Sequence, residues 1–458
     1  MLWVGYYFLN KNHSKDDYYV GGRNMSAGHI GLSVVATDVG GGFSIGLGGL
    51  GFVMGLSGSW MLFTGLLGAW LSAVWLIPKV YPLAKKHHFL SFPQALHHFY
   101  NKRVAFVAGI ISLIGYVGFT SSQILAGAKL ASATFPSFSL QHAVVIMGVI
   151  AVVYTVIGGI KAVIYTDTVQ WIILMVGLIF LGIPIGYIKL GGWETIQLFV
   201  PDNQLSLGNI TWSEALNWLI TIVPIWFIAM TLYQRVYACK DVNTAKKAWK
   251  IAGFFEWPIM AFMGVVLGLF AKVALLQGLF TEYGYMASAN MDAELGLPLF
   301  LRHVLPVGVM GLMMSAYFSA IMSTADSCLM AASGNLITDV LAPYFPNIDD
   351  NLRVSQCITL IIGALSILLA LNMQEVLSLM LHSYAFMVSG LLIPVLMMLT
   401  LKKPASKAAM VAMVSGGSTT LIITFTNYAL PAGLDPIFAG ILISLLGFVL
   451  TQKLLNKA

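Results

Sequence analysis

Long apolar segments separated by short polar connections dominate this sequence. A helix needs about 20 apolar residues to cross a bilayer, and twelve segments reach that length. We expect membrane-spanning helices at residues 27–54, 58–83, 103–133, 139–158, 161–188, 212–236, 246–276, 303–340, 354–373, 375–401, 407–428 and 434–452. These runs are continuous, whereas the strands of a membrane barrel alternate in polarity over about ten residues. The pattern therefore predicts an all-α multi-pass membrane protein.

Shorter segments complete the pattern. Residues 1–10 are apolar but about half as long as a span, and they lack the basic start and cleavage site of a signal peptide. We interpret them as the remnant of a first helix. Residues 91–100 are amphipathic and are expected to lie along the membrane interface. The connections 189–211 and 277–302 are expected to form caps or short helices over an outer vestibule.

Composition and charge agree with this membrane class. The chain has 458 residues, of which 58% are hydrophobic and 9% charged, whereas soluble domains carry about 25% charged residues. When the loop at 11–26 is placed in the cytoplasm, twenty of the 24 Lys and Arg residues fall on the inner side, as the positive-inside rule requires. The exceptions are Lys129, Lys189, Lys272 and Arg302. We expect a protein of the plasma (cell inner) membrane, with a cytoplasmic C-terminus.

The remaining composition excludes several classes. The net charge of +6 resides in short loops between spans and does not indicate a nucleic-acid partner. The three cysteines are isolated, so they indicate neither a metal site nor a disulfide framework. No metal cluster or nucleophile–base pair points to an enzyme. The oligomeric state is left open.

The first span, 27–54, carries features that a continuous membrane helix tolerates poorly. Asp38 lies within it, and three glycines, Gly40, Gly41 and Gly42, follow. A glycine lowers helix stability by about 1 kcal/mol relative to alanine, and an ionisable group deep in the membrane costs about 3 kcal/mol or more. We expect the helix to break between residues 36 and 42 and its freed carbonyls to face a cation. The alternative is a glycine-rich helix packed closely on its neighbours.

Hydroxyl groups line one face of the span at 303–340. Ala320, Ser323, Thr324 and Ser327 follow i, i+3, i+4, i+7 spacing, and Asp326 borders their face. Two adjacent hydroxyls supply neutral oxygens for a small hard cation, and carbonyls from a nearby break would complete its shell. The alternative is that these hydroxyls bond back to the preceding helical turn.

Other polar groups lie inside the apolar segments. Asp167 lies about two turns into the span that follows the Gly158–Gly159 turn. Its carboxylate is expected either to attract and release a cation near the inner mouth or to form a structural ion pair with a loop lysine. Glu256, His303 and His382 are interpreted as structural.

Several stretches resemble the sodium:solute symporter family, over nearly the whole chain. The matching motifs are DDYYVGGRNMS, ATDVGGG, YTVIGGIKAVIYTDTVQ, QRV at 234–236 and AIMSTADS. The resemblance implies a LeuT-type fold, in which two five-helix repeats are inverted relative to one another. The repeats would be residues 27–188 and 212–401, joined by the outer connection 189–211. A partial N-terminal helix with a cytoplasmic loop (1–26) and accessory C-terminal helices (402–458) would flank them.

The resemblance also implies where sodium, the expected coupling ion, would bind. The family's main sodium site corresponds to the backbone carbonyls of Ala36, Val39 and Ala320 and the hydroxyls of Ser323 and Thr324. A second, less widespread sodium position, or a release path, would use Asp167, Asp326 and Ser327. An acid at position 326 departs from the family pattern, which has a hydroxyl there.

The same comparison leaves the solute open. Asp38 resembles the first-helix aspartate of proline-type members, but Gly42 stands where those members carry an aromatic ring. The tryptophans of a choline-type cation–π cage correspond to Asp38, Gly118 and Ala229. We expect the solute beside the break, lined by Asp38, Gly40, Gly41, Gly42, Phe43, Tyr116, Gln123 and Trp226.

The expected function is secondary active transport, in which sodium entry drives uptake of a small polar organic solute by alternating access across the lipid bilayer. The alternative is a transporter-like membrane sensor that binds a small solute without net transport. A cytoplasmic output domain would mark such a sensor, and the sequence from residue 451, at the end of the last span, reads TQKLLNKA.

Overall fold

The computed structural model describes residues 20–38, 40–135, 137–158, 160–287, 290–345, 348 and 352–457. All regular elements in these ranges are helices. Nine helical stretches there are long and apolar enough to cross a membrane, or ten if the bent pair at 212–228 and 230–238 forms one span. The predicted all-α multi-pass class is confirmed. The number of twelve spans and the division into inverted repeats stay predictions, and residues 1–10 lie outside the described ranges.

The helices, in chain order, are α3 (Ala27–Asp38), α4 (Gly40–Met54), α5 (Trp60–Leu71), α6 (Ile77–His87), α7 (Phe92–Phe99), α8 (Lys102–Thr134), α9 (Leu140–Gly158), α10 (Ile160–Gly177), α11 (Ile183–Lys189), α12 (Gly192–Phe199), α13 (Trp212–Ile228), α14 (Met230–Ala238), α15 (Val242–Phe254), α16 (Ala261–Leu276), α17 (Ala293–Val304), α18 (Val307–Asn335), α19 (Leu352–Leu371), α20 (Val376–Thr400), α21 (Ser406–Phe425) and α22 (Pro436–Lys457). Short π-helical segments follow α5, α10, α15 and α18 at Ser72–Leu76, Leu178–Gly182, Phe255–Met260 and Leu336–Leu341.

The first predicted span is broken where the sequence indicated. Helix α3 ends at Asp38 and α4 begins at Gly40, and Val39 between them lies outside the described residues. Gly40 has φ +44°, in the left-handed region that residues with a Cβ atom enter only at a cost. The glycine run therefore allows the chain to leave one helix and enter the next.

A second break was not predicted. The segment 212–236 was expected to be continuous, but α13 ends at Ile228, and α14 continues from Met230 at an angle of 45°. Ala229, between them, has extended backbone, with φ −69° and ψ 118°. The freed amide of Thr231 donates to the Tyr116 hydroxyl of α8 at 3.0 Å. A distant side chain thus replaces the missing helical hydrogen bond.

Other boundaries also differ from those expected. The segment predicted to span from 303 begins as α18 only at Val307, because Pro306 precedes it and α17 is a separate helix ending at Val304. The span predicted from 246 starts at Val242, where the Asp241 carboxylate caps the amide of Thr244. The amphipathic segment 91–100 forms the helix α7, which is capped by the Ser91 hydroxyl, and its position along the membrane interface stays a prediction.

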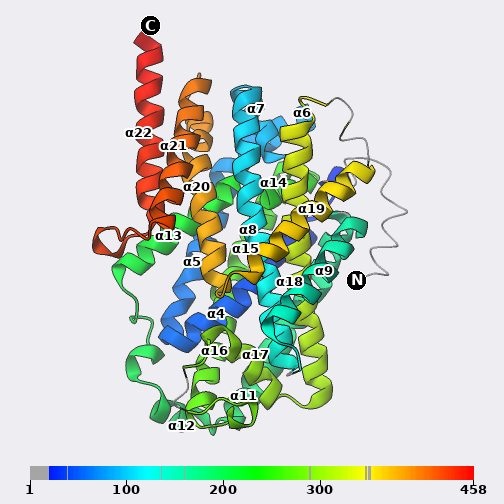
Figure 1. The fold of residues 1–458 in the computed structure, drawn as a ribbon, viewed down its shortest axis with the longest axis vertical. Coiled ribbons are helices and arrows are strands. Elements are labelled where there is room, and N and C mark those ends of the chain that lie inside the picture. The colour runs from blue at the N-terminus through cyan, green and yellow to red at the C-terminus, as the bar shows by residue number, and fades with distance from the viewer. Residues whose placement is uncertain are drawn as a thin grey trace.

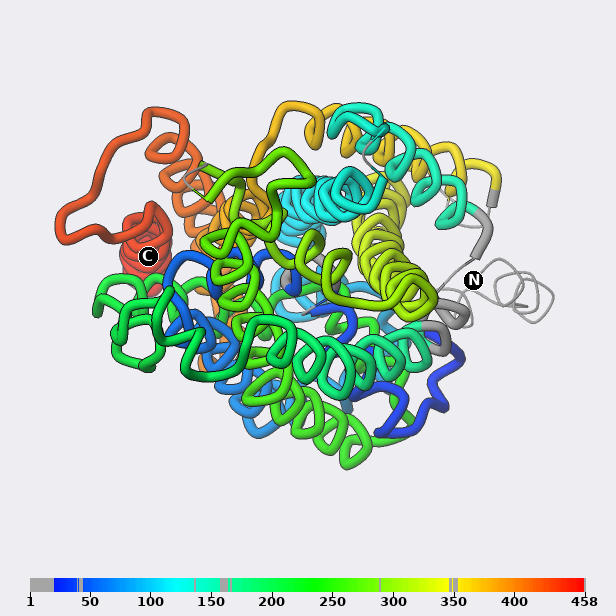
Figure 2. The backbone as a smooth tube through the Cα atoms, turned by 90° about the horizontal axis from the view of Figure 1, so that it is seen from below, coloured from blue at the N-terminus to red at the C-terminus, as the bar shows by residue number. Residues whose placement is uncertain are grey.

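The helices are arranged around a central pair. Helices α8 and α18 pack against each other, and α4, α9, α10, α19 and α20 contact one or both of them (Figure 2). Helices α21 and α22 pair with each other and lie against α20 at one side of the bundle. Figure 1 shows α12 and α17, from the predicted outer connections, toward one end of the molecule, and α6, α7 and the C-terminus at the other end.

Candidate functional site

The break after α3 lies against the hydroxyl face of α18. Thr324 is fully buried, and its hydroxyl donates to the carbonyl of Ala36 at 3.0 Å and to that of Ala320 at 3.2 Å. A Cβ atom at Gly40 would lie 2.5 Å from the same hydroxyl oxygen. The structure therefore brings together Ala36, Ala320 and Thr324, three of the residues expected to bind sodium. The hydroxyl also makes the back-bond to the preceding turn that was the alternative.

Ser323, the neighbouring hydroxyl, faces Asp167 of α10. Its hydroxyl donates to Asp167 Oδ1, and the Ser33 hydroxyl of α3 donates to Asp167 Oδ2 at 2.6 Å. Asp167 is buried, with 1% of its surface exposed. This carboxylate thus links α10 to both helices of the candidate cation site. Val39, the remaining expected ligand, lies outside the described residues.

Arg235 neutralises Asp167. The sequence placed this arginine at the inner end of a span, but the structure buries it completely on α14. Its guanidinium lies 3.3 Å from Asp167 Oδ2. The guanidinium also donates to four other oxygens: the Ser33 hydroxyl (3.0 Å), the Thr231 carbonyl (3.1 Å), the Ser327 hydroxyl (3.2 Å) and the Thr37 hydroxyl.

This network replaces the ion pair with a loop lysine that was one interpretation of Asp167. It satisfies the donors of a buried arginine, which a single carboxylate would not do. The one signal in the sequence that could have singled out Arg235 is its place in the QRV motif at 234–236. Its pairing with Asp167 could not be predicted, because it depends on how α14 packs.

Asp326 lies beside this network on α18. The Thr155 hydroxyl of α9 donates to Asp326 Oδ1 at 2.6 Å. In the part of the chain that the structure describes, the other carboxylate oxygen has no hydrogen-bond partner. Of the three residues expected at a second sodium position, Asp167 and Ser327 therefore bond to Arg235, while Asp326 bonds to Thr155.

Asp38 and Glu256, a residue that was interpreted as structural, lie close enough to influence each other electrostatically. Glu256 belongs to the π-helical segment after α15 and is fully buried, while 6% of Asp38 is exposed. Among the described residues, neither oxygen of Glu256 has a hydrogen-bond donor. No feature of the local sequence showed that these two acids, more than 200 positions apart, would lie near each other.

The other residues that were expected to line the solute site lie on several helices. Tyr116 supports the second break through Thr231, and the Gln123 amide donates to the Ser122 hydroxyl at 3.3 Å. Trp226 is fully buried on α13, edge-on to another tryptophan ring. The backbones of Gly41 and Gly42 form the first turn of α4, and the side chain of Phe43 lies outside the described part.

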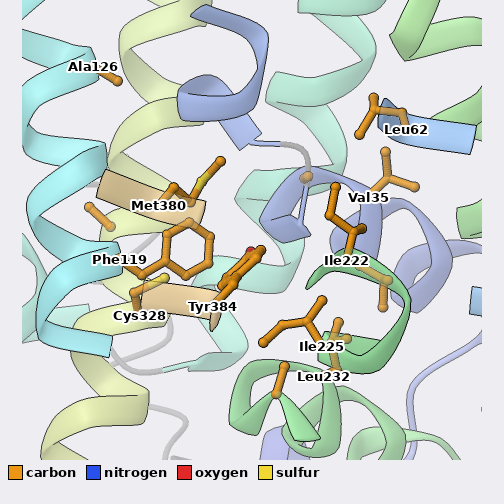
Figure 3. Close-up of a cluster of buried hydrophobic side chains, with 14 of the residues drawn as sticks. Val35, Leu62, Phe119, Ala126, Ile222, Ile225, Leu232, Cys328, Met380 and Tyr384 are labelled. Carbon is orange, nitrogen blue, oxygen red and sulfur yellow. The ribbon is translucent and has the colours of Figure 1, made fainter. Parts of the chain in front are cut away.

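Apolar side chains fill the space between the break and α8. Figure 3 shows Phe119, Met380 and Tyr384 on one side of this cluster, with Val35 and Ile222 on the other. Phe119 and Tyr384 meet edge to face, with ring centroids 5.1 Å apart. The polar groups of the site are thus held in a largely apolar interior.

The end that carries α17 has a cavity and a group of ion pairs. The cavity measures about 610 Å³ and is lined in part by Glu282, Tyr283 and Arg302. Hydrogen bonds from Tyr283 and His303 hold the pKa of the Glu282 carboxyl below its usual value.

A buried lysine pairs with two acids at the same end. Lys129 lies 2.6 Å from both Asp292 and Glu294. Glu294 also accepts the first amides of α20, those of Val376 and Leu377, at 2.9 and 3.0 Å. Glu294 therefore joins α8, α17 and α20.

Comparison with known proteins gives concordant results. The model of the sodium:solute symporter family matches residues 18–416. The chain is 26% identical to the high-affinity proline transporter PutP of Bacillus subtilis (strain 168), over 99% of this chain and 96% of that protein. It is also 26% identical to the sodium/glucose cotransporter of Vibrio parahaemolyticus, over 94% of this chain and 83% of that protein.

A solved structure shares the fold. The outward-open, substrate-bound structure of a sodium-coupled sialic acid symporter matches with a TM-score of 0.79 at 20% identity, covering 99% of this chain and 95% of that one. The likeness supports the transporter fold implied by the motifs.

Proposed function

The chain belongs to the sodium:solute symporter family, and on that premise we propose that it couples inward sodium movement to uptake of a small polar organic solute by alternating access. The matching relatives are named as transporters and cotransporters, not as enzymes. The chain is accordingly a multi-pass membrane protein of a transporter family.

One observed contact supports the proposed sodium site. The Thr324 hydroxyl of α18 contacts the Ala36 carbonyl at the break after α3. Neutral oxygens from a hydroxyl and from unpaired carbonyls are the ligands that a small hard cation uses. A sodium ion bound here would hold the two helices together, and its loss to the cytoplasm would release them. Sodium would therefore bind one conformation more tightly than the other, and this difference in affinity would couple the movement of the ion to that of the solute.

The driving force is electrical and chemical. One positive charge that moves inward across about 100 mV releases about 2.3 kcal/mol, and the sodium gradient adds to it. We further propose one sodium ion per transport cycle. The support is that Arg235 already supplies a positive charge to Asp167 and donates to Ser327. Asp167 would then serve the release of sodium, because it accepts a hydrogen bond from Ser323.

The relatives do not identify the solute of this chain, because their names refer to proline and glucose, which differ in charge and shape. The family match gives no support to the alternative of a transporter-like sensor. Solute counterflow into proteoliposomes distinguishes the two candidates, because a sensor would bind the solute without moving it.

The double substitution Ser323→Ala with Thr324→Ala tests the sodium site. Each hydroxyl contributes about 1.5–3 kcal/mol to a charged partner, so the sodium concentration for half-maximal thermal stabilisation should rise by about tenfold or more. Ser315→Ala is the matched control on the same helix, since its exposed hydroxyl donates to the Gly311 carbonyl of that helix. An unchanged sodium response in a folded double variant would show that sodium does not bind at this site.

A further inference from the structure

Two hollows adjoin at the end of the bundle that carries α17. The first is the cavity of about 610 Å³, whose lining includes Glu282 and Arg302. The second is a groove of about 370 Å³ formed by α8, α9 and α18, with Ile146 and Phe318 on its walls. Phe138 lines both hollows. A charged cavity and an apolar groove therefore share one wall.

The groove faces outward, on the surface that a membrane protein turns toward lipid. Ile146 and Ile150 line it from α9, and they are 41% and 51% exposed although both are apolar. Helix α9 packs on α8 and α18 at the outside of the bundle (Figure 2). Apart from Ser319, the described side chains that line the groove are apolar. Exposed apolar surface of this kind in a membrane protein suits a lipid acyl chain.

Arg302 gives the adjoining cavity a positive charge. Its guanidinium donates to the Ala133 carbonyl at 2.8 Å and lies over the Tyr283 ring, 4.4 Å from the centroid. With the described residues it forms no salt bridge. A guanidinium has five N–H donors and binds phosphate well. The two contacts therefore fix the orientation of Arg302 and leave donors for an anion.

Glu282 supplies the opposite charge. One of its oxygens lies 3.0 Å from the His303 ring, and its side chain is 59% exposed. A carboxylate has about four acceptor positions, so Glu282 can also accept from an ammonium group. Both charged residues lie near the end of α17, whereas Phe318 in the groove lies about three turns into α18. The charges are thus at the helix ends, and the groove runs along the apolar helices.

We propose that the cavity and the groove bind one phospholipid with a zwitterionic head group. Its phosphate contacts Arg302, its primary ammonium contacts Glu282, and an acyl chain lies in the groove. Phosphatidylethanolamine has this chemistry. Phosphatidylglycerol would bring only negative charge to Glu282, and the quaternary ammonium of phosphatidylcholine has no N–H to donate.

The test measures lipid binding to the purified, delipidated full chain by native mass spectrometry. The probes are dioleoyl-phosphatidylethanolamine, dioleoyl-phosphatidylcholine and dioleoyl-phosphatidylglycerol, which share their acyl chains and differ only in the head group. Phosphatidylethanolamine should bind about two- to fivefold more tightly than either of the others, because the contact with Glu282 is partly exposed to solvent. Neither a solute nor a sodium gradient is present, so the result does not depend on transport.

Two variants separate the head-group contacts. Glu282→Gln should abolish the preference for phosphatidylethanolamine over phosphatidylcholine. Glu194→Gln is the matched control, since this exposed acid of α12 lies outside the lining of both hollows, and it should keep the preference. Arg302→Gln should weaken binding of all three lipids by about tenfold, because each carries a phosphate.

A third variant tests the groove. Ile146→Trp places a larger side chain in it and should weaken binding of all three lipids. Val149→Trp is the matched control, because Val149 is 50% exposed on the same helix but does not line the groove.

Three results would overturn the inference. They are equal binding of phosphatidylethanolamine and phosphatidylcholine by the unmodified protein, tighter binding of phosphatidylglycerol, and equal lipid binding by Ile146→Trp and Val149→Trp. The first and third results do not require the Arg302→Gln protein to fold.

Discussion

Gly40→Ala is the sharpest test of the broken helix as a sodium site. Gly40 has φ +44°, and a residue with a Cβ atom pays about 1–2 kcal/mol in this left-handed region. The new methyl group would also lie 2.5 Å from the Thr324 hydroxyl, which must turn away from the Ala36 carbonyl at a cost of about 1 kcal/mol. Together these terms amount to about 2–3 kcal/mol. Because both act on the geometry that would hold sodium, the affinity for sodium should fall roughly 30- to 150-fold.

The assay is sodium titration of thermal stability on the purified protein, followed by sodium-driven uptake in proteoliposomes once a solute is identified. Gly28→Ala is the matched control on α3, since a Cβ atom there meets no atom within 4 Å. It should leave the sodium response unchanged. A folded Gly40→Ala protein with the same half-saturating sodium concentration as the control would refute the reasoning, because the break would then not shape the ion site.

Two further predictions concern buried charges. Arg235→Met should lower the free energy of unfolding by about 3–5 kcal/mol, because it leaves a buried carboxylate unpaired, and Arg235→Lys should cost less; equal melting temperatures for Arg235→Met and the unmodified protein would contradict this. Glu294→Gln should lower the free energy of unfolding by about 1.5–3 kcal/mol, because Glu294 is buried and bonds to both Lys129 and α20. Asp292→Asn should lower it by less than about 1 kcal/mol, because the Asp292 side chain is 38% exposed. Hydrogen exchange at the start of α20 should rise only in Glu294→Gln, and a greater effect of Asp292→Asn would reverse the assignment.

The two helix breaks show what local sequence can predict. The break before Gly40 was predictable, because successive glycines and an ionisable group act on the segment that contains them. The break at Ala229 was not, since it depends on the Tyr116 hydroxyl of α8 accepting the freed amide of Thr231. No glycine occurs at that position, so the segment alone resembled an ordinary span.

The buried charges show the same contrast. Arg235 was assigned to the cytoplasmic side because basic residues gather there, but on α14 it is fully buried and pairs with Asp167. Glu256 was interpreted as structural, but the π-helical segment buries it completely, and neither of its oxygens has a hydrogen-bond partner among the described residues. Burial and pairing of this kind depend on helices that are distant in the sequence, and hydropathy carries no information about them.

The sequence by itself determined the membrane class, the position of most helices, the first break and the helix face that carries the hydroxyl groups of α18. These features follow from the transfer of apolar side chains out of water and from backbone preferences, which belong to each segment separately. Only the tertiary structure decided which hydroxyl meets which carbonyl and which acid Arg235 neutralises. In a low-dielectric interior each charged or polar group must find a partner, and the identity of that partner is settled by how the helices pack.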